Sequence, residues 1–392
     1  MGNRSSLGLP SGSGPHLVGC ADIMADHTRK GTFFRLYYPC QAAEDSEQPL
    51  WIPRSEYCNG LADYMNLNKN WFTPLLKLTF GSFQVPVRWC APIVPGLKFP
   101  LLIFSHGLGA FRTVYAAVCL EMASHGFLVA AVEHRDCSAS ITYHYKEASS
   151  LSTEEPVLPN CYLQEEWINY RKIKQEEKEF KVRNLQLHQR ANECVRALNL
   201  VNKINDGRSI VNVMKSDFDI ESLKNRVDME KVGVIGHSFG GATSLLALLK
   251  DDRFRCAIAL DAWMFPIENN LYFQMRKPAF FINTETFQTT DSITKMKKLF
   301  QNNKETKMIT ILGTVHQSHS DFTFLTSPWL SRIYETRGKL QPERALEITA
   351  RAAMAFLNRH LDLNEEFNSW DNLVEGKGTD IIPNAPPVLS NL

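Results

Sequence analysis

The chain has 392 residues, of which 44% are hydrophobic and 10% aromatic, and this composition excludes an intrinsically disordered protein. Its 43 Lys and Arg residues nearly balance its 42 Asp and Glu residues, so the net charge of +1 excludes broad electrostatic capture of nucleic acid. The nine cysteines are scattered without a C-x-x-C pair, which favours free thiols in a reducing compartment.

Residues 1–30 are expected to form a mostly irregular arm without a secretory signal, because they lack the apolar centre of such signals. The first six residues, MGNRSS, match the pattern M-G-x-x-x-[ST], so removal of the initiator Met would expose Gly2 for myristoylation. The alternative is an ordinary unmodified tail. One acyl chain binds a membrane only weakly, and we therefore expect a cytoplasmic protein that associates with membranes reversibly.

Two segments precede the main pattern of the chain. Residues 31–39 are rich in aromatic and branched residues and end at a proline, which predicts an early strand. In residues 71–81, Thr73 could cap a short helix in which Pro74 takes the first position and Gly81 the end. The large apolar side chains of this helix would either contact a membrane or pack on the core. They include Trp71, Phe72, Leu75 and Leu76.

From residue 99 onward, short apolar runs alternate with longer helical stretches, which is typical of βαβ units and a mainly parallel sheet. The expected strands are residues 99–104, 127–133, 232–235, 256–260, 279–283 and 308–312. The expected helices are residues 113–124, 184–203, 242–250, 291–300 and 342–360. A polar stretch, residues 138–183, interrupts the alternation as an inserted excursion. The sequence thus predicts one domain over residues 31–363 and a largely irregular tail over residues 364–392.

The most informative motif is G-H-S-F-G at residues 236–240, which lies between an expected buried strand and an expected helix. A G-x-S-x-G turn in this setting is the nucleophile elbow of α/β-hydrolases. Strand and helix nearly touch at such a turn, so glycine fits two residues before and two residues after the serine. We therefore expect a single-domain α/β-hydrolase with a mainly parallel central sheet and Ser238 as its nucleophile.

A serine hydroxyl needs a base, and the base needs a carboxylate that orients it. In this fold the chain order is Ser, then Asp or Glu, then His. His316 follows directly on the last expected strand, whereas His319 is the weaker candidate and His360 falls in the last turn of a helix. The carboxylate stays open between Asp261, which ends a buried strand, and Glu285, which follows the next one.

Two backbone N–H groups must stabilise the oxyanion of the reaction. One would come from Phe239, directly after the nucleophile. The other would come from the loop S-H-G-L-G at residues 105–109, where Leu108 lies between two glycines. His106 in this loop precedes the nucleophile in the chain, so a role in bracing the loop is favoured over a role as base.

Three segments, FSHGLGAFRT (104–113), GHSFGGA (236–242) and LDAWM (260–264), resemble the platelet-activating factor acetylhydrolases of the calcium-independent phospholipase A2 group. The resemblance extends over roughly residues 14–363 and is greatest for the intracellular type II enzyme. It implies a triad of Ser238, Asp261 and His316, with Leu108 and Phe239 as oxyanion donors. The resemblance thus favours Asp261 over Glu285.

The resemblance also implies the substrate: phospholipids that carry an acetyl, short or oxidised acyl group at the sn-2 position. A triad activates the serine directly, so no metal and no cofactor are expected. The expected partners are this substrate and a membrane surface, and no nucleic acid. Two alternatives share the scaffold. One is a general carboxylesterase or serine peptidase, and the other is a non-catalytic hydrolase-like binding protein.

Overall fold

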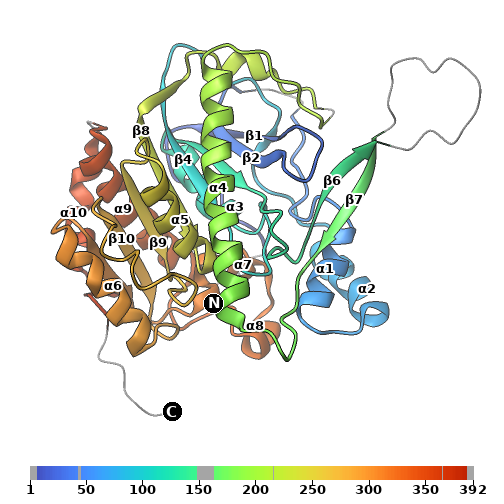
Figure 1. Cartoon of the computed structure of the whole chain (residues 1–392). Coiled ribbons are helices and arrows are strands. Elements are labelled where there is room, and N and C mark those ends of the chain that lie inside the picture. The colour runs from blue at the N-terminus through green and yellow to red at the C-terminus, as the bar shows by residue number, and fades with distance from the viewer. Residues whose placement is uncertain (1–6, 43–45, 148–162, 215, 364, 386–392) are drawn as a thin grey trace, which may run out of the picture.

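A ten-stranded sheet forms the centre of the molecule, in the order β12-β11-β10-β9-β8-β4-β5-β2-β1-β3 (Figure 1). The computed structural model describes residues 7–42, 46–147, 163–214, 216–363 and 365–385. The strands from β5 to β11 in this order run parallel, and antiparallel strands flank them on both sides. The expectation of a mainly parallel sheet is confirmed.

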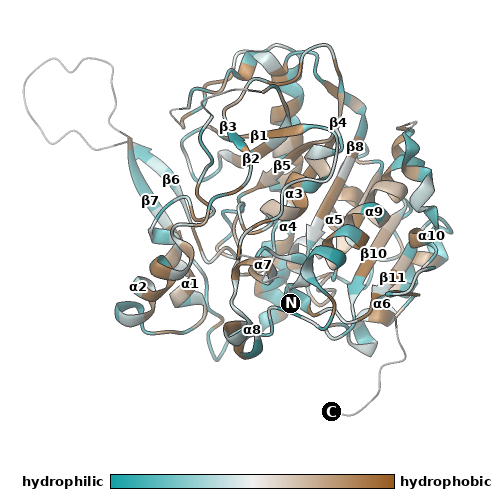
Figure 2. Ribbon diagram, turned by 180° about the vertical axis from the view of Figure 1, so that it is seen from behind, coloured by the Kyte–Doolittle hydropathy of each residue, from teal (hydrophilic) through white to brown (hydrophobic). Residues whose placement is uncertain are grey.

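The parallel strands coincide with the expected apolar runs. They are β4 (Phe99–Ser105), β5 (Leu128–Val132), β8 (Val227–His237), β9 (Cys256–Leu260), β10 (Ala279–Thr284) and β11 (Lys307–Ile311). Apart from residues 228–231 at the start of β8, both faces of these strands are buried, so their sequences are nearly continuous in hydrophobic residues, as the colours of Figure 2 show.

Helices cover both faces of this sheet and divide the core into two layers. On one face lie α3 (Ala116–Ser124) and α9 (Pro342–Leu361). On the other face lie α4 (Glu179–Asn205), α5 (Phe239–Lys250) and α6 (Thr290–Asn302). All five were expected, with ends that shift by up to five residues. Within the described ranges, no helix combines the length and the apolar character that crossing a membrane requires.

The expectation of a mostly irregular N-terminal arm is wrong for Leu17–Ala25, which form β1. β1 pairs antiparallel with β2 (Thr32–Cys40). It was missed because Asp22 interrupts its apolar run. That carboxylate is buried between two guanidinium groups, at 2.8 Å from Arg35 and 2.6 Å from Arg112, and Arg112 lies far along the chain.

The inserted excursion contains regular structure. It holds an antiparallel hairpin of β6 (Ile141–Glu147) and β7 (Leu163–Asn169), which extends away from the central sheet (Figure 1). The strand β7 is mostly exposed and hydrophilic, as Figure 2 shows, which hid it from a search for apolar runs. The end of the excursion belongs to α4, which begins at Glu179 instead of residue 184.

The expected irregular tail is also partly ordered. Its last strand, β12 (Ile381–Pro383), pairs antiparallel with β11 at the edge of the sheet. Two short helices, η3 (Glu366–Trp370) and α10 (Asp371–Val374), pack against α9. Segments of three to five residues are too short to show a period in the sequence.

The remaining elements lie around the carboxyl ends of the strands or at the sheet border. They are α1 (Glu56–Tyr64), α2 (Lys69–Phe80), β3 (Arg88–Trp89), η1 (Ile220–Leu223), η2 (His316–His319), α7 (Phe322–Leu325) and α8 (Pro328–Tyr334). The predicted cap of α2 is wrong. Asn68 caps this helix, and its side chain accepts a hydrogen bond from the backbone of the first turn, while Thr73 and Pro74 lie inside the helix. Gly81 ends it, as expected.

Candidate active site

The turn between β8 and α5 places Ser238 at the carboxyl edge of the sheet. Ser238 has φ 56° and ψ −117°, a backbone conformation that is strained for a residue with a side chain. Its N–H donates to the carbonyl of Leu260 at 2.9 Å, and its own carbonyl accepts from the N–H of Trp263 at 2.9 Å. These two bonds tie the turn to the end of β9.

The close approach of strand and helix explains the glycines of the motif. A Cβ atom on Gly236 would lie 2.2 Å from the carbonyl oxygen of Gly240. A Cβ atom on Gly240 would lie 1.9 Å from the carbonyl oxygen of Ser105 on the neighbouring strand β4. Both contacts are with backbone that cannot move aside, so larger residues are excluded at these two positions.

His316 lies beside this turn and is held from two sides. Its Nδ1 is 2.7 Å from Oδ2 of Asp261, and the ring of Phe287 stacks on the imidazole with centroids 3.6 Å apart. His316 and Ser238 line the same cavity. The structure thus brings together Ser238, Asp261 and His316, which follow β8, β9 and β11, at one edge of the sheet.

Asp261 is fully buried and accepts several hydrogen bonds. The N–H and Oγ1 of Thr284 donate to it at 3.1 and 2.6 Å, and Nε2 of Gln288 donates at 2.8 Å. Burial alone would raise the pKa of Asp261, but the bonds from His316 and Thr284 outweigh burial and hold that pKa below its ordinary value. The carboxylate is therefore charged beside the imidazole.

The other candidates of the sequence make contacts that differ from those of Asp261 and His316, although the ring of His319 lies 5.7 Å from that of His237. Oε2 of Glu285 accepts from the N–H of Gly313 at 2.5 Å, so this carboxylate braces the loop that leads to His316 and leaves the imidazole to Asp261. Burial lowers the pKa of His319 to about 4, which keeps it neutral. His360 lies in the last turn of α9 against the ring of Phe356.

The backbone N–H of Phe239 is oriented by its own peptide plane. Phe239 is the first residue of α5, so its N–H has no acceptor within the helix. The other side of this peptide is the Ser238 carbonyl, which accepts from Trp263 and from Gly241. Because a trans peptide points its C=O and N–H in opposite directions, these bonds aim the Phe239 N–H away from β9.

Leu108 is oriented in the same way by the loop that follows β4. The carbonyl of Gly107, in the same peptide plane as the Leu108 N–H, accepts from Nδ1 of His106 at 2.8 Å and from Ala110 at 3.3 Å. The N–H of Gly107 donates to the Tyr115 hydroxyl at 3.1 Å. Leu108 lines the cavity that also contains Ser238.

The tautomer of His106 follows from its two contacts. Nε2 accepts from the N–H of His134 at 3.2 Å, so the proton is on Nδ1, which donates to Gly107. Burial, followed by the charge of Arg190, lowers the pKa of His106 well below its ordinary value. His106 is therefore neutral and braces the loop, as the sequence favoured.

The cavity has a volume of about 270 Å³, and most of the side chains that line it are apolar. Helix α2 contributes Phe72, Leu75 and Leu76, and helix α8 contributes Leu330 and Tyr334. Both helices also expose large apolar side chains. These are Trp71 (78% exposed), Leu75 and Leu78 (82%) on α2, and Trp329 (69%) and Ile333 on α8.

Sequence reasoning missed several residues of this site. Thr284 ends β10, and Phe287 and Gln288 follow it closely. This position at the carboxyl edge of the sheet was the available signal. Helix α8 was missed altogether. Its signal is the spacing of Trp329 and Ile333, which places two large apolar residues on the same side of a short helix.

Comparisons with known proteins place the chain among relatives of one family. A family model described as platelet-activating factor acetylhydrolase, isoform II, matches residues 1–381. Proteins named platelet-activating factor acetylhydrolase from Bos taurus and Gallus gallus are each 47% identical to the chain. The matches cover 96% and 97% of this chain, and 82% and 90% of those proteins. A putative phospholipase A2 from Schizosaccharomyces pombe is 27% identical, with 98% of both chains covered.

The fold has a counterpart among solved structures. A ferulic acid esterase from Streptomyces cinnamoneus matches with a TM-score of 0.65, covering 97% of this chain and 99% of that one. The sequence identity is 16%, so this likeness concerns the fold alone. The expectation of an α/β-hydrolase is confirmed.

Proposed function

Since the chain belongs to the family of platelet-activating factor acetylhydrolases, isoform II, we propose that it hydrolyses the sn-2 acetyl ester of phospholipids through Ser238, Asp261 and His316. Short and oxidised acyl groups at the same position are included in this proposal. The observation that carries the assignment of residues is the 2.7 Å contact between His316 and the buried Asp261, beside a serine on a nucleophile elbow.

In the first step the Oγ of Ser238 attacks the ester carbonyl. Asp261 holds the proton of His316 on Nδ1, so Nε2 is the basic nitrogen that takes the serine proton. Asp261 also stabilises the imidazolium that forms. The N–H groups of Leu108 and Phe239 stabilise the oxyanion, and each contributes roughly 3–4 kcal/mol to lowering the barrier.

His316 then returns its proton to the leaving lysophospholipid, and an acyl-enzyme on Ser238 remains. Water, activated by the same imidazole, releases the acyl group as acetate or a short carboxylate. Every proton transfer of this sequence is made by a side chain of the triad. The reaction therefore proceeds without calcium, another metal or a cofactor.

We also propose that α2 and α8 contact the lipid surface from which the substrate enters. Trp71 and Leu75 on α2 and Trp329 on α8 are exposed, and both helices line the cavity that contains Ser238. Contiguous exposed apolar side chains beside a site are typical of a lipid contact. Phe72 and Leu76, also expected to touch the membrane, line the same cavity as Leu75 and stay part of this proposed contact.

This contact would be reversible and would act on cytoplasmic membranes. Gly2, the expected myristoylation site, lies outside the described residues. A single acyl chain and a small apolar surface are each weak, and stable binding needs both. Mass spectrometry of the mature N-terminus from a eukaryotic host tests the acylation, and an unmodified Gly2 would contradict it.

The decisive experiment measures hydrolysis of phospholipids with sn-2 acetyl, oxidised short-chain and long-chain groups in excess chelator. Wild type should cleave the first two, and Ser238→Ala should cleave none. Cleavage of a simple aryl ester alone would point to a general carboxylesterase. Failure of a fluorophosphonate probe to label Ser238 would point to a binding protein without catalysis.

A further inference from the structure

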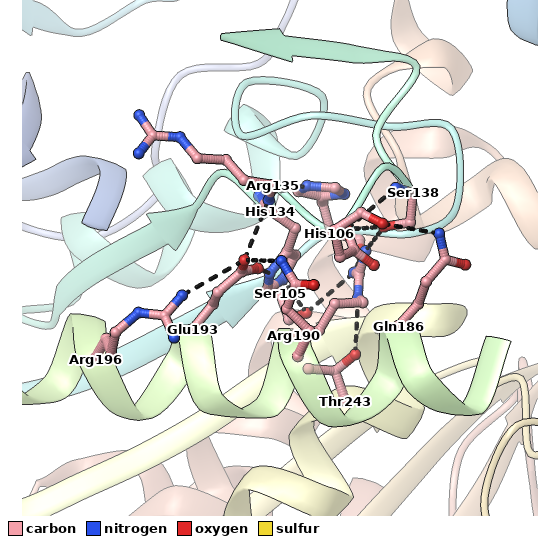
Figure 3. Close-up of polar contacts among 12 residues, drawn as sticks. Ser105, His106, His134, Arg135, Ser138, Gln186, Arg190, Glu193, Arg196 and Thr243 are labelled. Atoms are coloured by element: carbon pink, nitrogen blue, oxygen red, sulfur yellow. Dashed lines mark hydrogen bonds and ion pairs between the residues drawn. The ribbon is translucent and has the colours of Figure 1, made fainter. Parts of the chain in front are cut away.

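Arg190 is a buried cation that lies behind the oxyanion hole. It projects from α4, its side chain is fully buried, and no carboxylate of the described residues forms an ion pair with it. Figure 3 shows Gln186, Arg190 and Glu193 pointing from one side of α4 towards the segments after β4 and β5. Burying a charge is costly unless hydrogen bonds compensate it, so the position of each acceptor is informative.

The first set of contacts reaches the loop that carries Leu108. Nη2 of Arg190 donates to the carbonyl of His106 and lies 3.3 Å from Oγ of Ser105 (Figure 3). Nη1 donates to Oγ of Ser138. The carbonyl of Ser138 in turn accepts from the N–H of Gly109 at 2.8 Å. Arg190 therefore holds both ends of this loop, one directly and one through Ser138.

The second set of contacts reaches Phe239. The guanidinium carbon lies 4.6 Å from the centroid of the Phe239 ring. Nε donates to Oγ1 of Thr243 at 3.0 Å (Figure 3). This hydroxyl in turn donates to the carbonyl of Phe239 at 2.8 Å. The same side chain thus contacts the residue that supplies the second N–H group.

We propose that Arg190 is a positioning residue that fixes the loop of Leu108 and the first turn of α5 relative to each other, and so sets the geometry of the oxyanion hole. This inference rests on the proposed esterase function. Preorganised donors stabilise an oxyanion because they need no rearrangement during the reaction. The two donors lie on segments that are more than a hundred residues apart in the chain, and one guanidinium joins them.

The test compares Arg190→Met and Arg190→Lys with Arg183→Met in hydrolysis of p-nitrophenyl acetate. Arg183 is a matched control, because it is also buried on α4 and bonds to Gln186 and Tyr170, whereas no hydrogen bond within the described part of the chain joins it directly to either segment. We expect Arg190→Met to lower kcat by about 10²-fold with KM nearly unchanged, because acylation and deacylation use the same hole. Arg190→Lys should lie between wild type and Arg190→Met.

A second readout separates positioning from general stability. A trifluoromethyl ketone adds to Ser238 and leaves an oxyanion in the same hole. Its affinity should fall with Arg190→Met by about the same factor as kcat, on the order of 10²-fold. Arg183→Met should lower the unfolding temperature while kcat and the inhibitor affinity stay within about twofold of wild type.

Should Arg190→Met fail to fold, Thr243→Val decides the matter, because it removes one acceptor of Arg190 and keeps the shape of the side chain. A several-fold loss of kcat at constant KM would support the inference. Unchanged kcat and inhibitor affinity in the folded variants would overturn it. Failure of the wild-type protein to hydrolyse the aryl ester would contradict the proposed esterase function. This outcome is distinct from an unchanged kcat in the Arg190 variants, which would contradict only the role of Arg190.

Discussion

At the scale of single residues, a substitution of Asp261 should show how much catalysis depends on the correct tautomer of His316. Asp261→Asn keeps the size of the side chain but no longer fixes the proton of His316 on Nδ1. We expect kcat to fall by roughly 10⁴-fold, since the imidazole then presents the wrong tautomer to Ser238. Steady-state kinetics with an aryl ester measures this loss.

Glu285→Gln is the control for this substitution, because the other acidic candidate follows the neighbouring strand. Its side chain can still accept the hydrogen bond from Gly313, so kcat should change by less than about threefold. A loss in Glu285→Gln as large as in Asp261→Asn would contradict the assignment of the carboxylate.

The sequence alone identified Asp261 and Glu285 as the two candidates for the carboxylate that orients His316, and left both open. Asp261 and Glu285 follow adjacent parallel strands, so both reach the same edge of the sheet. The choice depends on contacts that no local pattern shows: Asp261 has φ 44°, and Thr284 and Gln288 converge on its carboxylate. The short side chain of Asp261 and the buried strand before it gave a slight preference, and the family resemblance strengthened that preference.

At the scale of elements, the ion cluster of β1 makes stability depend on pH. Burial alone would raise the pKa of Asp22, but Arg112 and Arg35 outweigh burial and hold it well below its ordinary value. The stabilisation is therefore present above about pH 4, the unfolded pKa, and is lost as pH falls through the lower folded pKa. Urea unfolding between pH 7 and pH 3 should show this loss in wild type.

Asp22→Asn tests the same cluster at constant pH. Among the described residues, it leaves the buried guanidinium of Arg35 without a carboxylate and that of Arg112 with Glu133 alone, which should lower the free energy of unfolding by about 3–5 kcal/mol at pH 7. Its unfolding free energy should also decline less than that of wild type on acidification. A parallel decline in both proteins would show that the acid sensitivity comes from other groups.

The exposed side of α2 should control attachment to lipid. Leu78 is among the most exposed apolar residues, so Leu78→Glu should leave the fold intact and weaken binding to phosphatidylcholine vesicles on the order of tenfold. Val211→Glu is the matched control, because Val211 is also exposed but lies outside α2 and α8, next to Asn212, which pairs with Ala25 at the end of β1. Equal vesicle binding by both variants would rule out α2 as a contact.

The elements that sequence reasoning found differ physically from those it missed. The parallel strands are buried on both faces, so their apolar runs are visible without any knowledge of partners. The strand β1 depends on Asp22, whose charge is acceptable only because Arg112 approaches it in the folded chain. The strand β12 has only three residues, and it is a strand because it pairs with β11, not because of its amino-acid composition.

At the scale of the whole molecule, the last strand of the sheet supports the catalytic edge. β12 covers the outer edge of β11, and β11 leads to the loop of His316. Truncation after Leu363 should expose this edge, lower the unfolding temperature by several degrees and reduce kcat. Truncation after Ala385 keeps β12 and should leave both quantities unchanged. Calorimetry and aryl ester hydrolysis on the two truncated chains measure the difference.

The general architecture was predictable from the sequence, whereas the shape of the cavity was not. The alternation of strands and helices indicated the sheet and the edge at which the chemistry occurs. The walls come from α2 and α8, which are far apart in the chain and meet only through tertiary packing. Contacts between helices so distant in the chain do not affect the local pattern of apolar residues, so the sequence does not reveal them.

The backbone of Ser238 has a consequence for how this protein can change over time. Its φ of 56° costs a serine about 1–3 kcal/mol, and the same conformation suits glycine. Ser238→Gly should therefore be roughly 1 kcal/mol more stable than Ser238→Ala in urea unfolding, although both are inactive. Selection for stability alone would favour glycine over serine at position 238. A serine at this strained position is therefore what the proposed role of Ser238 as nucleophile requires, and stability gives no reason for it.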